Sequence, residues 1–160
     1  MANLKMKGLD EYEKQLTKLQ NISRECVGQA IYQGAKEIAD EVKRNIEAIP
    51  IDQRKLKPGQ VLHGVTASQK QGLRDGFGIA RIQNDNGYVH VKLGFAGYNS
   101  TITDKYPNGQ PNSMIARSLQ SGTSFRDRIP FVDNAVSAKK GACEQKMIET
   151  FDKVLAKEIR

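Results

Sequence analysis

The side chains able to do chemistry are few in this chain of 160 residues, and they stand far apart. The two histidines are His63, in a long irregular stretch, and His90, on the outer face of a predicted hairpin. Nucleophilic or acid–base catalysis would need an acidic partner to orient one of these rings, and no spacing in the sequence indicates such a partner. We therefore interpret both histidines as surface residues and expect no enzymatic activity.

The remaining candidates for chemistry are two cysteines and a glycine-rich run. Cys26 and Cys143 lack the Cys-x-x-Cys spacing of a zinc site, and both fall on or beside the apolar faces of predicted helices. This placement is typical of small buried hydrophobic residues in a reducing compartment. The run Gly72–Gly78 matches neither a Walker loop nor a dinucleotide fingerprint. We expect no metal and no cofactor.

The chain is basic, with 25 Lys and Arg against 18 Asp and Glu and a formal charge of +7, which favours a polyanionic partner. The densest excess lies between Ile51 and Asp75, where no aromatic residue stands among the cations to stack on bases. We interpret this charge as a basic surface. The candidates for assembly or phosphate contacts are Arg54, Lys55, Lys57 and Arg74.

Length and composition predict a single domain over residues 1–160. Only 38% of the residues are hydrophobic and there is no tryptophan, so the core should be thin and compatible with stability borrowed from neighbouring subunits. No hydrophobic run follows the first charged residues, and no stretch approaches the roughly 18 apolar residues of a membrane span. We expect a cytoplasmic site of synthesis and no membrane partner.

Apolar spacing predicts most of the helices. Gly8–Gln20 reads as a short amphipathic helix, which Asn21–Ser23 interrupts. A longer helix then runs from Ser23 to about Ile49 and ends at Pro50. Gly28 and Gly34 lower its helix propensity, which indicates a close approach to another element.

The only clear sheet signal is Asn86-Gly87, the pair typical of a two-residue type I′ hairpin turn. A turn centred there pairs Ile82 with Val91, Ala80 with Leu93 and Gly78 with Phe95. One face of the hairpin then carries Ala80, Ile82, Val89, Val91, Leu93 and Phe95. Two irregular loops, Pro50–Gln71 and Gly97–Ser113, flank the hairpin, and we expect the first to be mobile until it is bound.

The most informative stretch runs from Met114 to Ala135. It reads as a short helix, a glycine stop, a polar turn and a final helix from Pro130 to about Lys157, with Phe131 anchoring its start. This order resembles the closing motif of the gene-ten-like tail-component family of siphophages. The matching residues are Gly122-Thr123-Ser124, a basic spacer with Arg126 and Arg128, and then Pro130-Phe131 with Ala135.

A second, weaker likeness to this family lies earlier in the chain. Gln71-Gly72-Leu73-Arg74 occupies the position of the family's Thr-Gly-x-Leu-Arg run but lacks its threonine. The order of helices, loops and hairpin agrees from about Leu4 to the C-terminus. Together these features predict an α+β fold: a small antiparallel sheet built on the Phe77–Phe95 hairpin, packed against two long helices, with long polar loops.

The resemblance implies a non-enzymatic virion structural protein that completes the tail at the head–tail junction. Such a protein would be assembled in the host cytoplasm as a ring homo-oligomer, such as a hexamer. Its partners would be the tail tube protein and the head-completion or connector proteins, with non-specific contact to passing DNA. The alternative is a stand-alone basic nucleic-acid-binding module, which the charge favours and the lack of a recognisable reader motif disfavours.

Overall fold

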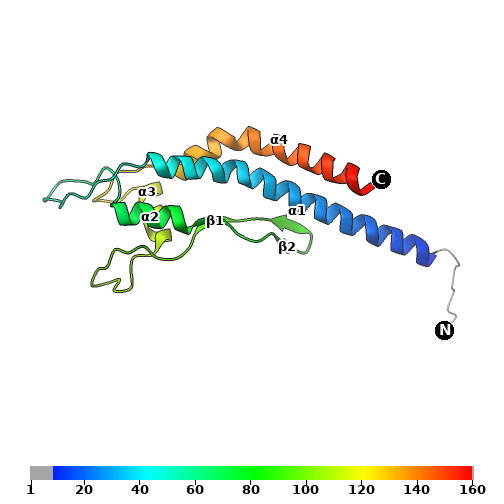
Figure 1. Ribbon diagram of the computed structural model, residues 1–160, viewed down its shortest axis with the longest axis horizontal. Helices are drawn as coiled ribbons and strands as arrows, with labels where there is room; N and C mark the ends of the chain where they lie inside the picture. The colour runs from blue at the N-terminus through cyan, green and yellow to red at the C-terminus, as the bar shows by residue number, and fades with distance from the viewer. Residues whose placement is uncertain (1–8, 160) are drawn as a thin grey trace.

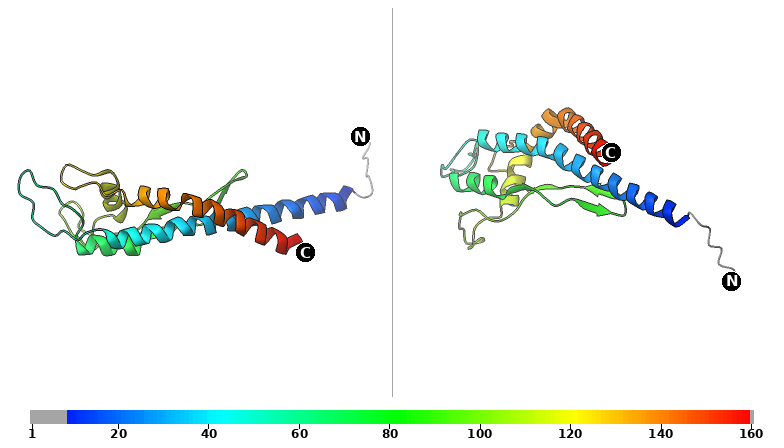
Figure 2. Two further views of the ribbon diagram at one scale, coloured as in Figure 1. Left: turned by 90° about the horizontal axis from the view of Figure 1, so that it is seen from above. Right: turned by 45° about the vertical axis from the view of Figure 1, so that its right-hand side comes forward.

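The fold is α+β, as predicted, and is organised around two long helices that run side by side in opposite directions (Figure 1). The computed structural model describes the backbone of residues 9–159 and the side chains of residues 13–159. The first long helix is α1 (Leu9–Ala48) and the second is α4 (Phe131–Ile159). The hairpin lies along α1 on the side away from α4 (Figure 2).

The predicted break at Asn21–Ser23 is wrong, because α1 is one continuous helix of 40 residues. Asn and Ser cost a helix only a few tenths of a kcal/mol each, and neither glycine nor proline stands in this segment to stop it. The predicted end is confirmed, since α1 finishes at Ala48, two residues before Pro50. The first residue of the expected helix Gly8–Gln20 lies outside the described residues.

Of the two glycines of α1, Gly34 marks a close approach of another element, as predicted, whereas Gly28 lies at an ordinary contact distance. A methyl group at Gly34 would fall 2.6 Å from Cγ of Met147 on α4, so α4 packs directly against the α1 backbone there. Gly28 faces the hairpin, and a methyl group at Gly28 would lie 3.5 Å from Cδ1 of Ile82. Cys26 and Cys143 are both buried and unbridged, which confirms their interpretation as small core residues.

The predicted end of the loop Pro50–Gln71 is wrong, because helix α2 (Ala67–Gly76) begins before Gln71. Thr66 caps this helix: its hydroxyl accepts from the backbone N–H of Gln69, and the Gln69 side chain accepts from the N–H of Thr66. This reciprocal pair is a capping box, and its Thr-x-x-Gln spacing is visible in the sequence. The base of the remaining loop is closed by Asp52 N–H, which donates to Val65 C=O over 2.8 Å.

The hairpin turn at Asn86-Gly87 is confirmed, and both residues have positive φ, as a type I′ turn requires. Next to the turn, β2 (Gln83–Asp85) pairs with β3 (Tyr88–His90) in the predicted register. Farther out, β1 (Phe77–Ile79) pairs with β4 (Leu93–Phe95).

The predicted register fails in this outer half, where every pair is displaced by one residue. Phe77 pairs with Phe95, whereas the sequence analysis paired Gly78 with Phe95. The cause is one extra residue on the first side: three residues separate β1 from β2, but only two separate β3 from β4. As a result Phe77 and Ile79 face the core, and Ala80 is exposed.

The hydrophobic core lies where α1, α4 and the β1–β4 pair meet α2 and the short helix α3 (Asn112–Ser121). The end of the predicted Gly97–Ser113 loop and the start of the predicted final helix agree with the structure to within two residues. Among the residues from 9 to 159, no helix has the length and apolar character needed to cross a membrane. The largest fully buried side chains are Phe131, Ile46, Ile49, Leu73, Leu119, Val42, Val65 and Cys26.

Candidate functional site

The predicted motif begins where α3 stops. Gly122 ends the helix with a φ of 73°, a conformation that favours glycine. Thr123 and Arg126 then close a turn through two backbone hydrogen bonds, of 3.0 Å from the Thr123 N–H and 3.4 Å from the Arg126 N–H. Thr123 and Ser124 are both exposed in this turn. The Gly-Thr-Ser part of the motif therefore forms a tight surface turn.

The second half of the motif enters the core. Pro130 stands directly before α4, and Phe131, its first residue, is 1% exposed and meets the ring of Phe95 edge-on at 5.8 Å between centroids. Ala135 is fully buried one turn later. The side-chain amide of Asn45 on α1 donates to the Phe131 C=O over 2.9 Å. The predicted anchoring role of Phe131 is thus confirmed.

Arg126, one of the two cations of the basic spacer, is buried within the loop of residues 122–130, which we call the motif loop. It is 4% exposed, and its guanidinium donates to Ser118 Oγ on α3 (2.6 Å) and to Gln69 Oε1 on α2 (3.2 Å). Burial lowers the pKa of Arg126, because desolvation disfavours the charged form. Arg128, the other cation of the spacer, is exposed and donates to the C=O of Gln120 over 3.1 Å. Of the two spacer cations, only Arg128 is exposed.

The loop that follows α1 is docked onto the motif loop. Leu62 N–H donates to Phe125 C=O (2.8 Å), and Asp127 N–H donates to Leu62 C=O (2.9 Å). His63 adds a side-chain contact, since its Nδ1 lies against the carboxylate of Asp127. Two segments more than sixty residues apart in the sequence therefore form one surface.

Three of the five cations of the segment Ile51–Asp75 are already engaged within the chain. The guanidinium of Arg54 bonds both carboxylate oxygens of Asp52, at 2.8 and 2.7 Å. Arg74 does the same with Glu47, at 2.5 Å to each oxygen. Lys70 is buried and donates to the C=O of Glu47 (2.7 Å) and of Ile49 (2.9 Å), where it caps the carbonyl end of α1.

The two other candidate cations, Lys55 and Lys57, are exposed near the tip of the same loop. In the part of the chain with described side chains, neither forms an ion pair. The structure therefore brings Arg54, Lys55 and Lys57 together on one loop but leaves only the two lysines unneutralised. Arg74 lies on a different element, in the last turn of α2.

The expectation that neither histidine has an acidic neighbour is wrong. His63 contacts Asp127, and His90 has Nδ1 3.7 Å from a carboxylate oxygen of Asp85 and Nε2 2.9 Å from Gln83 Oε1. For His63 the missing signal was the folding together of two distant loops, which no spacing encodes. Asp85 and Gln83 stand beside His90 in the same hairpin, so their approach follows from the hairpin register. Within residues 13–159, neither imidazole is hydrogen-bonded to a Ser, Thr or Cys side chain that could act as a nucleophile.

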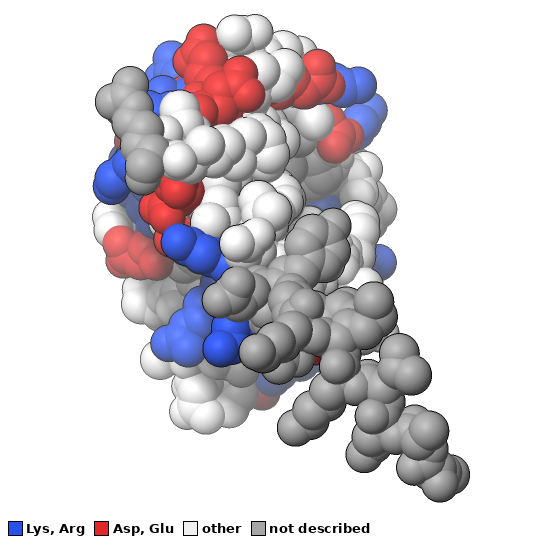
Figure 3. Space-filling model, turned by 90° about the vertical axis from the view of Figure 1, so that its right-hand side faces the viewer, with Lys and Arg blue, Asp and Glu red and all other residues white. Residues whose placement is uncertain are grey.

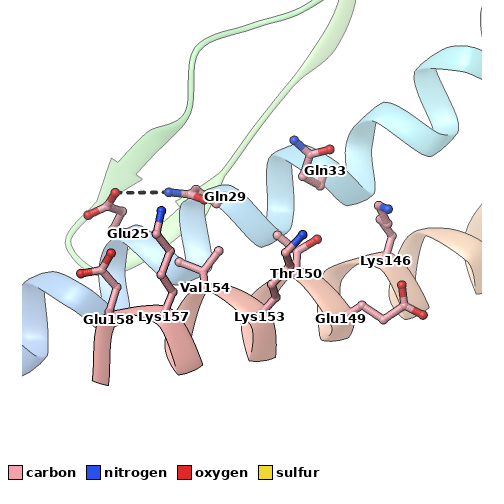
Figure 4. A pocket seen from close by; sticks show the side chains of 10 residues that line it. All are labelled: Glu25, Gln29, Gln33, Lys146, Glu149, Thr150, Lys153, Val154, Lys157 and Glu158. Carbon is pink, nitrogen blue, oxygen red and sulfur yellow. Dashed lines mark hydrogen bonds between the residues drawn. The ribbon is translucent and has the colours of Figure 1, made fainter. Parts of the chain in front are cut away.

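A groove of ≈ 550 Å³ lies between α1 and α4 (Figure 4). Its walls mix both signs of charge, and the Gln29 amide donates to the Glu25 carboxylate across one turn of α1. Over the described residues, no three His, Cys, Asp or Glu side chains are grouped so that they could hold a metal ion. The lining residues are Glu25, Gln29, Gln33, Lys146, Glu149, Thr150, Lys153, Val154, Lys157 and Glu158.

Comparison of this chain with family models, with curated proteins and with solved structures finds no match. The functional interpretation therefore depends on the motif loop, the distribution of charge and the exposed apolar side chains.

Proposed function

We propose that this chain is a non-enzymatic virion structural protein that completes the tail at the head–tail junction. It assembles in the host cytoplasm through protein–protein contacts into a ring homo-oligomer, such as a hexamer. Its further partners are the tail tube protein and the head-completion or connector proteins. The sequence support is the resemblance of Gly122–Ser124 and Pro130-Phe131 to the closing motif of the tail-component family.

The observation that carries the proposal is the set of large apolar side chains exposed at the end of the molecule away from both termini (Figures 1 and 2). The loops 50–66, 96–111 and 122–130 gather there. Four of the twelve large apolar side chains that are exposed in the described part of the chain lie on these loops or at their base, and exposed apolar groups of this kind are typical of a protein–protein contact surface. They are Ile51 (55% exposed), Tyr98 (67%), Ile102 (71%) and Phe125 (49%).

The competing nucleic-acid module receives less support from the same region. Arg54 and Arg74 are held by carboxylates and Lys70 by backbone carbonyls, so they are not free to neutralise phosphates. Lys55 and Lys57 remain, and two flexible lysines carry no base-reading geometry. Contact with DNA would then be limited to phosphates of any sequence.

Size-exclusion chromatography with light scattering, followed by electron microscopy of the heaviest species, tests this function. We expect a concentration-dependent closed ring of identical subunits. A duplex titration in parallel should show weak, salt-dependent and sequence-independent binding. A chain that stays monomeric and prefers one duplex over scrambled competitors by more than about a hundredfold would support the nucleic-acid module instead.

A further inference from the structure

We infer that two oppositely charged surfaces on opposite sides of this chain bind each other between neighbouring copies. One is the solvent-facing side of α4, with Glu144, Ile148 and Asp152. The other is the hollow between α1 and β1 that Lys36 and Lys43 border. The inference rests on the proposed ring, because a ring of identical subunits needs two different contact surfaces on each copy.

The α4 surface combines acidic and apolar side chains that have no partner within the described chain. Ile148 and Ile159 are 58% and 68% exposed, although α4 buries its opposite side on α1 through Cys143. Glu144 and Asp152 lie four residues before and after Ile148, so all three share one face of the helix. Figure 3 shows acidic side chains at the top of the molecule, where α4 lies, with basic side chains beside them.

The second surface, on the opposite side of the chain, is a hollow of ≈ 190 Å³ whose lining includes Phe77 and Ile79. Lys36 and Lys43 stand on its α1 wall with Asp40 between them, which leaves one net positive charge. Both lysines are exposed, and neither forms an ion pair in the described part of the chain. The hollow therefore has apolar lining side chains between two cations.

The spacing of the charges matches on the two surfaces. A rise of 1.5 Å per residue places Glu144 and Asp152 about 12 Å apart along α4, with Ile148 midway. Lys36 and Lys43 are about 10 Å apart along α1, with the hollow between them. A neighbouring copy can therefore insert Ile148 into the hollow while its two carboxylates reach the two lysines.

The two surfaces also point in opposite directions, as contact from one copy to the next requires. Gly34 faces α4, where it contacts Met147. Lys36 and Lys43 follow Gly34 by two and nine residues, which at about 100° per residue turns both to the far side of α1. The α4 surface faces away from α1 altogether. Copies joined in this way stack head to tail and close into a ring or extend as a filament.

Paired charge reversals test the contact. Glu144→Lys with Asp152→Lys should leave the protein folded but monomeric, and so should Lys36→Glu with Lys43→Glu. Mixing the two double variants should restore assembly, because each reversed surface then meets its opposite on the other protein. Lys14→Glu with Lys18→Glu is the matched control for the lysine reversals, since it makes the same charge change as Lys36→Glu with Lys43→Glu at exposed positions on α1 outside both surfaces.

The readout is the mass by light scattering, with circular dichroism and melting temperature showing that each variant folds. If the wild-type protein assembles and each double variant on its own assembles equally well, this contact is overturned and the proposed function still stands. Wild-type protein that never assembles would overturn the proposed function itself. Assembly that only the mixture recovers, and that high salt weakens, supports the inference.

Discussion

At the scale of single residues, the motif divides into side chains that stabilise the fold and side chains left free for contact. Phe131 and Ala135 are buried in the core, whereas Thr123 and Ser124 stand on the surface of the turn. The anchoring role of Phe131 could be predicted, because an aromatic residue after a helix-starting proline is a local signal. The burial of Arg126 could not be predicted, because its partner Gln69 is 57 residues away in the sequence.

Truncation of Phe131 should destabilise the protein strongly. Phe131→Ala leaves a cavity beside Phe95, and the loss of a buried phenylalanine costs about 3–5 kcal/mol. Thermal unfolding followed by circular dichroism should show a large fall in melting temperature. The control is Phe125→Ala, which removes a half-exposed aromatic ring six residues before α4 begins and should leave the melting temperature nearly unchanged. Equal effects of the two substitutions would contradict this assignment.

Gly72 should tolerate no side chain, although it sits in a helix where alanine is normally preferred. A Cβ there would lie 2.2 Å from Asn112 Oδ1 and 2.6 Å from Asn99 Cβ, so α2 and α3 would have to separate. Overpacking of this kind costs about 1–3 kcal/mol. Chemical denaturation of Gly72→Ala should show the loss, while Gly78→Ala, whose added Cβ has no atom within 4 Å, should not.

At the scale of elements, the spacing of apolar residues predicted the helices that bury an apolar stripe. It missed α2, which buries no such stripe. The buried residues of α2 are Gln69, Lys70, Gly72 and Leu73, so hydrophobic spacing gives no signal and only the capping box remains. The hairpin turn was readable because it is local. Its outer register was not, since one extra residue before β2 shifts every pair beyond it.

The loop between α1 and α2 should lose a stabilising contact in acid. Hydrogen bonds from the Arg54 side chain and then from the His63 N–H hold the pKa of Asp52 well below its usual range. Because the folded-state pKa is lowered, this stabilisation is present above the ordinary pKa, about 4, and is lost as the pH falls below it. The melting temperatures of wild type and Asp52→Asn should therefore differ at about pH 6 and converge progressively in acid. A constant difference would argue against this role of Asp52.

At the scale of the whole molecule, the positive charge should support assembly or the passage of DNA without reading its sequence. Arg54, Lys55 and Lys57 share one loop, but Arg54 is already paired with Asp52. Replacing all three with Gln should weaken duplex binding equally for every sequence and flatten its salt dependence. Titrations at several salt concentrations, with scrambled duplexes as competitors, measure both effects. Selective loss of binding to one duplex would contradict the proposed function.

The contact of α4 with α1 along its length gives the protein two internal reporters of helix separation. Cys26 and Cys143 are buried where these helices meet, and burial raises the pKa of both thiols, which keeps them protonated and slow to alkylate. A thiol reagent can reach them only when the helices part, so the labelling rate reports how often they do. If assembly draws subunits together through α4, labelling should slow as the protein concentration rises, and each cysteine should report independently on its own part of the interface.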